Sequence, residues 1–206
     1  MKQFLIRLSH LTPLIAIALI AYAMWRGELS RRPDYEHNSP RTALARKTGK
    51  LPMSEVWQVV DGSVYDGDTL RVKRGWEEMK LRLCGIDAPE KDQPLGIEAR
   101  DYLRSQIGQG DGNVFVVPVE KDRYGRTVAE VFVSPRPGTG YQEQEEIHLN
   151  SQMMMAGYAW HYKRFSGNCP NRDGYDVAEQ IAKDNQVGVW ATPGAIPPWE
   201  WRKSQR

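Results

Sequence analysis

The stretch Met79–Glu90, with the sequence MKLRLCGIDAPE, joins a strand to a rigid acidic turn. Its first five residues alternate apolar and polar side chains with a period of two, which is typical of a half-buried β-strand. Arg82 interrupts this apolar strand, and the simplest interpretation is that it points outward with the pleat. In the turn, Asp87 and Glu90 flank a proline whose ring fixes the backbone. Two carboxylates on one rigid turn can converge on one cation.

Further strands and helices extend the pattern on both sides. Alternation predicts four more strands, at residues 56–60, 69–73, 113–119 and 127–133. Apolar residues at helical spacing predict helices at 97–107, 149–157 and around 175–182, with Gly157 ending the second and Gly188 the third. This order indicates an α+β fold that is mainly β. We expect a five-stranded Greek-key barrel of the OB type with about three helices, preceded by an N-terminal hydrophobic helix.

The first 54 residues differ in composition from the barrel domain, which we place at residues 55–192. Residues 1–25 contain an uncharged apolar run, and Ala21-Tyr22-Ala23 matches a cleavage pattern, so we expect a signal peptide or a transmembrane anchor. Residues 26–54 are polar and contain three prolines, which predicts a flexible polar linker. Basic residues on both sides of the run leave its orientation open. We expect an extracytoplasmic protein, either anchored or released.

Net charge and cysteine content give only weak information about binding partners and about the compartment. The 206-residue chain has a formal net charge of +2, which is weak support for a polyanionic partner. Its two cysteines, Cys84 and Cys169, fit no zinc pattern, because a structural zinc site needs four nearby ligands. Two free buried thiols and one disulfide remain as alternatives, and the compartment decides between them.

Three separate segments carry side chains suited to phosphate chemistry. Asp68, in the Asp66–Thr69 segment, adds a third hard oxygen donor to Asp87 and Glu90, and such donors suit calcium better than zinc or copper. Asp66-Gly67 is also a common hairpin signal. Arg126 follows a glycine, and arginine forks match phosphate oxygens. Phosphodiester hydrolysis requires both a metal site and cationic groups for the transition state.

Residues 64–70, 81–90 and 122–126 together resemble the three signature segments of the staphylococcal nuclease family. The resemblance extends over roughly residues 56–190 and includes the order and spacing of the segments. It implies a bacterial, calcium-dependent nuclease that cleaves DNA and RNA with little sequence specificity and leaves 3′-phosphate ends. It implies no protein partner, and we expect a monomer.

The resemblance also implies a role for each matching residue. Asp68 and Asp87 resemble calcium ligands, and Ala88 matches a position that binds calcium through its backbone carbonyl. Glu90 resembles the general base. The remaining matches are phosphate-binding arginines, nucleotide contacts and supporting residues at the metal site: Arg82 and Arg126, Arg123 and Tyr124, and Asp66 and Thr69, respectively.

Two features outside these segments complete the predictions. Cys84 and Cys169 resemble a pair in exported family members, which implies a disulfide. Residues 188–202 resemble the ending of bacterial members, and residues 193–206 are expected to form a strap on the barrel. Trp160, Tyr162 and Phe165 either stack on a base or only pack. The alternative function is a non-catalytic OB-fold module that binds nucleic acid or protein and is tethered to the membrane. Such modules lose the acidic and arginine residues, which are all present here.

Overall fold

Five strands form a closed barrel in the computed structural model, which describes residues 55–135 and 146–205. The order is β3-β2-β1-β5-β6, with antiparallel neighbours and a parallel pairing of β3 with β6 that closes the barrel. The strands are β1 (Glu55–Val59), β2 (Thr69–Arg74), β3 (Glu77–Leu83), β5 (Asn113–Lys121) and β6 (Thr127–Val133). A short β7 (Ile147–His148) extends the sheet beyond β6. The predicted five-stranded barrel is confirmed.

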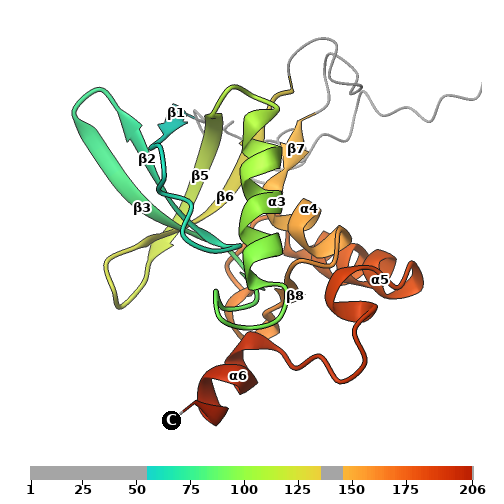
Figure 1. Cartoon of the computed structure of the whole chain (residues 1–206). Helices are drawn as coiled ribbons and strands as arrows, with labels where there is room; N and C mark the ends of the chain where they lie inside the picture. Colours follow the sequence, from blue (N-terminus) through green and yellow to red (C-terminus); the bar gives the residue numbers. More distant parts are fainter. Residues whose placement is uncertain (1–54, 136–145, 206) are drawn as a thin grey trace, which may run out of the picture. The chain divides into compact units, whose positions relative to one another are not determined.

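The barrel core is formed by inward-facing apolar side chains of these strands and by one face of a long helix. Leu70, Leu81 and Val131 are fully buried in one cluster. Helix α3 (Gly96–Gly108) adds Ala99, Leu103 and Ile107 to the same cluster, which confirms the predicted apolar face. Figure 1 shows α3 running alongside the barrel strands.

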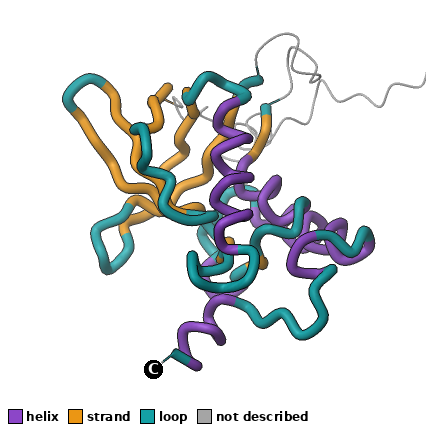
Figure 2. The backbone as a smooth tube through the Cα atoms, in the orientation of Figure 1, coloured by secondary structure: helices purple, strands orange, loops and turns teal. Residues whose placement is uncertain are grey.

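The other helices lie on the α3 side, and Figure 2 separates them in purple from the orange strands. They are α4 (Leu149–Met155), α5 (Tyr175–Asp184) and α6 (Pro198–Ser204), with short 3-10 turns at Lys163–Phe165, Arg172–Gly174 and Gly188–Trp190. Gly157, with φ of 72°, follows the end of α4 as expected. The predicted end of α5 at Gly188 is wrong, because the helix ends at Asp184 and Gly188 begins the last 3-10 turn.

A small second sheet joins the barrel to the helical layer. Strand β4 (Ile86–Asp87) pairs with β8 (Trp160–His161), which places Asp87 opposite Trp160. A disulfide between Cys84, directly after β3, and Cys169, in the loop before α5, crosses the same junction. Gly85 lies between these two links with φ of 71°, and a Cβ there would lie 2.5 Å from the Tyr175 ring. Only glycine fits this position without displacing its neighbours.

The C-terminal segment, expected as a strap, contains helix α6. Pro198 begins this helix at a position where the absent N–H costs nothing. The predicted signal peptide or anchor, its hydrophobic helix at residues 1–25 and the linker at residues 26–54 lie outside the described residues. Within residues 55–135 and 146–205, no helix is both long and apolar enough to cross a membrane.

Candidate active site

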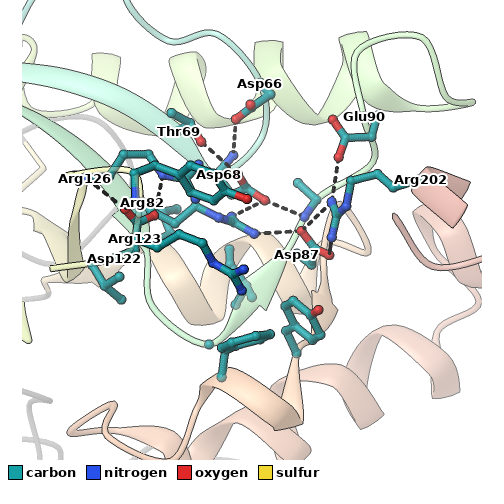
Figure 3. A pocket seen from close by; sticks show the side chains of 18 of the residues that line it. Asp66, Asp68, Thr69, Arg82, Asp87, Glu90, Asp122, Arg123, Arg126 and Arg202 are labelled. Atoms are coloured by element: carbon teal, nitrogen blue, oxygen red, sulfur yellow. Dashed lines mark hydrogen bonds and ion pairs between the residues drawn. The ribbon is translucent and has the colours of Figure 1, made fainter. Parts of the chain in front are cut away.

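One pocket of about 490 Å³ is lined by all ten predicted metal, catalytic, nucleotide-binding and supporting residues. They come from the segment leading into β2, the end of β3, β4 with the turn after it, and the turn between β5 and β6 (Figure 3). The ten are Asp66, Asp68, Thr69, Arg82, Asp87, Ala88, Glu90, Arg123, Tyr124 and Arg126. The fold therefore brings together three segments that are separate in the sequence.

Asp68 is held by hydrogen bonds from two directions. Its Oδ2 accepts the backbone N–H of Ala88 at 2.7 Å, and its Oδ1 accepts the Thr69 hydroxyl at 3.1 Å. Asp66 Oδ1 in turn accepts the Asp68 backbone N–H at 3.0 Å. Gly67 permits this approach, because a Cβ there would lie 2.6 Å from the Ala88 Cβ. The Asp66–Thr69 turn is thus packed directly against the acidic turn.

Arg82 points into the pocket, so the outward-pointing interpretation is wrong. Its guanidinium forms ion pairs with Asp68 and, at 2.7 Å, with Asp87 Oδ1 (Figure 3). Burial alone would lower the pKa of Arg82, but Asp68 and Asp87 outweigh it and raise that pKa above the ordinary value. Arg82 therefore stays charged while nearly buried.

Two carboxyl groups of the pocket, those of Asp66 and Asp87, have raised pKa values. Asp87 is almost fully buried, and burial raises its pKa despite the opposing charges of Arg82 and Arg202. Burial and the charge of Asp68 raise the pKa of Asp66 to about 7. Clusters of perturbed acids in a pocket are typical of functional sites.

The backbone of Glu90 is fixed by the start of α3. Its N–H donates to Gln93 Oε1 at 3.1 Å, and its carbonyl oxygen accepts the Gln93 N–H at 2.9 Å. Gly96, the first residue of α3, approaches the same carbonyl so closely that any Cβ would clash with it. The Glu90 side chain remains about one third exposed and can reach solvent in the pocket.

Arg126 is oriented by Asp122 across the β5–β6 turn. Asp122 Oδ2 accepts the Arg126 Nε–H at 2.7 Å, while Oδ1 accepts the backbone N–H groups of Tyr124 and Arg126 at 2.9 Å each. Burial would raise the pKa of Asp122, but these bonds from Arg126 and Tyr124 lower it. The Arg123 and Arg126 guanidinium groups lie 5.7 and 5.5 Å from the centre of the Tyr124 ring, which is largely exposed.

Two aromatic side chains and one arginine also line the pocket. Tyr162 and Phe165 contact each other edge to face at 4.7 Å, whereas Trp160 lies outside this pocket and pairs with Asp87 through β8. Arg202 on α6 donates to Glu90 Oε1 at 2.6 Å and to Asp87 Oδ2 at 2.7 Å. The sequence held no signal for Arg202, because 112 residues separate it from Glu90.

The chemical type of the oxygen atoms in this pocket suits a hard cation. Asp68, Asp87, Glu90 and the Ala88 carbonyl offer oxygen ligands only, which is the chemistry that calcium prefers. Among the described residues, no three acidic, histidine or cysteine side chains are arranged to hold a metal. Arg82 and Arg202 instead form ion pairs with oxygens of these carboxylates. A cation would therefore need backbone carbonyl and water ligands, and a shift of at least one guanidinium.

Comparisons with known proteins show which family the chain resembles. Residues 80–192 match the family described as "Staphylococcal nuclease homologue". The chain is 35% identical over 153 residues to "Protein ParB" of Escherichia coli, covering 73% of this chain and 83% of that protein. It is 35% identical to "Micrococcal nuclease" of Shigella flexneri, covering 69% and 79%, respectively. An "Uncharacterized endonuclease" of Haemophilus influenzae is also 35% identical, covering 69% and 71%.

Proposed function

The chain belongs to the staphylococcal nuclease family, and we propose that it hydrolyses phosphodiester bonds of DNA and RNA with calcium as its cofactor. The observation that carries the proposal is the convergence of acidic side chains and arginines on one pocket. Phosphodiester hydrolysis needs both kinds of group, because the attacking water must be deprotonated while negative charge on the phosphate is stabilised.

The metal would be held by Asp68 and Asp87, whose carboxylates both pair with Arg82, and by the carbonyl oxygen of Ala88, a residue of the same pocket. Bound there, calcium supplies positive charge for a phosphate oxygen and acidifies a water molecule. The bond between the Ala88 N–H and Asp68 keeps the peptide and the carboxylate in a fixed relation. Asp66 and Thr69 support the site through their bonds to Asp68.

Glu90 acts as the general base, and two arginines stabilise the phosphate. Glu90 takes a proton from water, and the water oxygen attacks phosphorus. The bond between phosphorus and the 5′ oxygen breaks, and the departing oxygen takes a proton from solvent water, so the products carry a 3′-phosphate and a 5′-hydroxyl. Arg82 at the end of β3 and Arg126 just before β6 both line the pocket and donate to the phosphate oxygens as charge develops.

The exposed residues at the pocket suit substrates of many sequences. Arg123 and Tyr124 offer a charge for the backbone and a ring face for a base. Tyr162 and Phe165 add aromatic surface. Contacts of this kind depend on phosphate and on stacking, neither of which distinguishes bases strongly. Little sequence specificity is therefore expected.

We also propose that the protein acts outside the cytoplasm. The Cys84–Cys169 disulfide supports this location, because such bonds persist in oxidising compartments. The apolar run in residues 11–25 supports export as well. Labelling of thiols in intact cells, with and without reductant, tests the location. Free labelling of both cysteines without reductant would count against export.

The test of function is digestion of plasmid DNA and of RNA by the full-length chain, with calcium and with chelator. We expect cleavage only with calcium, and losses of roughly 10²-fold or more in Glu90→Gln and Arg126→Ala, since each removes a transition-state contact. Arg172→Ala is the matched control, because Arg172 is exposed outside the pocket. The mechanism would be refuted if activity in chelator equalled that in calcium, or if both pocket variants were as active as the natural chain.

The product ends provide a second test. Fragments with 5′-hydroxyl ends accept a labelled phosphate from a polynucleotide kinase without prior dephosphorylation, whereas fragments with 5′-phosphate ends do not. Direct labelling is expected. A non-catalytic binding module would retain labelled DNA in a gel-shift experiment and leave it intact with calcium present.

A further inference from the structure

Helix α6 forms one wall of the catalytic pocket although it lies beyond the residues matched to the family. Trp199 of this helix stacks on Tyr162 with ring centres 4.8 Å apart and planes 9° apart. The carbonyl oxygen of Ile196, just before the helix, accepts the Gln93 side-chain N–H at 2.7 Å. These contacts place α6 between the aromatic residues and the acidic turn.

From this helix, Arg202 reaches the two carboxylates of the acidic turn (Figure 3). Its Nη1 lies 2.6 Å from Glu90 Oε1 and 3.3 Å from Asp87 Oδ1, and its Nη2 lies 2.7 Å from Asp87 Oδ2. One guanidinium thus spans both acids in the fork geometry that gives the strongest arginine–carboxylate contacts. Burial alone would lower the pKa of Arg202, but the bonds to Asp87 and Glu90 raise it.

The other arginines of the pocket have different partners. Arg82 contacts Asp68 and the opposite oxygen of Asp87, and Arg126 contacts Asp122. Arg202 is therefore the principal counter-charge of Glu90 and of Asp87 Oδ2 among the described residues. A divalent cation bound by Asp87 uses the same oxygens and repels a guanidinium at that distance. The Arg202 guanidinium and a divalent cation therefore cannot both occupy the position beside the Asp87 carboxylate.

We propose that Arg202 competes with the divalent cation for Asp87 and Glu90, so that α6 sets the cation concentration at which the pocket fills. The inference rests on the proposed function, since it concerns the cation which that function requires. In the free protein, Arg202 keeps two nearby carboxylates from repelling each other. On binding, its long side chain swings away, and the helix can remain in place through Trp199 and the Gln93 contact.

Calorimetric titration of the full-length chain with calcium tests the competition. We expect Arg202→Gln to bind calcium about tenfold more tightly than the natural chain, the factor expected if the paired state holds about nine-tenths of the free molecules. Lys203→Gln is the matched control. Lys203 follows Arg202 on α6, carries the same charge and pairs with Glu200 instead of the pocket acids. Its loss should change the affinity less than about twofold if local contact, not net charge, is the cause.

A second measurement follows Arg202 itself. In the natural chain, the nuclear magnetic resonance signal of the Arg202 guanidinium, identified by its loss in Arg202→Gln, should shift as calcium saturates. Asp87→Asn should abolish both the shift and the binding.

The outcomes separate this inference from the proposed function. Calcium binding that depends on Asp87 but is equal or weaker in Arg202→Gln would overturn the competition and leave the function standing. A guanidinium signal that stays fixed through saturation would do the same. A lack of calcium binding in both the natural chain and Arg202→Gln would overturn both.

Discussion

The side-chain amide of Asn150 on α4 donates a hydrogen bond of 2.9 Å to the backbone carbonyl oxygen of Cys84, directly after β3. The same amide contacts the Ala129 carbonyl of β6 at 3.3 Å, and its oxygen accepts the Val131 N–H at 3.0 Å. Asn150 is fully buried. One side chain therefore bonds to both strands at the place where β3 meets β6 and the barrel closes.

Replacing Asn150 should destabilise the domain strongly. Asn150→Ala leaves buried backbone groups of both strands without partners, and we expect a loss of about 2–4 kcal/mol in the free energy of unfolding. Urea denaturation measures it. Asn168→Ala, at an exposed asparagine that bonds only Glu120 in the contacts described, is the control, with an expected change within about 0.5 kcal/mol. Equal midpoints for the two variants would refute the role of Asn150.

Removing the disulfide should also lower stability. The bond joins residues 85 positions apart, and closing so long a loop in the unfolded chain corresponds to about 3–5 kcal/mol. We expect this loss in the double variant Cys84→Ala, Cys169→Ala, measured by urea denaturation beside the oxidised natural chain. Adding reductant should bring the natural chain close to the variant. No difference between oxidised and reduced protein would contradict the expectation.

Asp122 should support catalysis through Arg126. Asp122→Asn keeps acceptors for the turn N–H groups but removes the charge that orients the guanidinium, so we expect about a tenfold loss of kcat. KM should change less than kcat if Arg126 acts mainly in the transition state. Asp101→Asn, at an exposed acid bonded to Arg100 and Arg104, is the control. A kcat equal to that of the natural chain would show that Arg126 needs no orienting partner.

His148 should make the fold sensitive to acid. It is buried against Phe132, with ring centres 4.7 Å apart, and burial lowers its pKa from 6.5 to about 3. Below pH 6.5 the unfolded chain binds a proton that the folded chain rejects. Stability is therefore lost as the pH falls from about 6.5 toward 3, by up to about 1.4 kcal/mol per pH unit.

The variant His148→Gln isolates this contribution. Glutamine does not titrate, so its stability should fall less steeply than that of the natural chain between pH 6 and 4, whatever its stability at pH 7. Glu130, which lies 3.9 Å from His148, has a pKa raised by burial and acts in the opposite direction in both proteins. Parallel curves of unfolding free energy against pH would contradict the assignment.

The barrel and most of the site could be predicted because their signals are local. Period-two alternation places β2 and β3, and the short segments that carry Asp68, Asp87 and Arg126 are specific in combination, through their order and spacing. Strand β4 has only two residues, too few for any period to appear. Its pairing with β8 depends on the helical layer, and no local pattern in the chain indicates it.

The sequence-based prediction also missed the long-range polar contacts. Asn150 looks like an ordinary polar residue of a short helix, and its partners lie 19 to 66 residues away. Arg202 looks like a solvated charge near the chain end. The pleat alone would place Arg82 on the outer face, whereas the family resemblance assigns it to the phosphate site, where it pairs with Asp68 and Asp87. The alternation of apolar and polar residues shows which face of a strand is buried. It does not show that a charged side chain is buried through an ion pair.

The two walls of the pocket should differ in local stability, because only one of them is fixed through the junction that holds Cys84 and Cys169. The aromatic wall is fixed to the barrel by the disulfide, by the β4–β8 pairing and by the Tyr162 N–H bond to Gly85 O at 2.8 Å. Helix α6 makes only noncovalent side-chain contacts with the pocket in the part of the chain described. Amide protons of α6 should therefore exchange through a local opening, while those of β3 and β6 exchange only when the whole domain unfolds. The opening equilibrium of α6 then governs access to the acidic turn. Substitutions in α6 can change this equilibrium without altering the barrel.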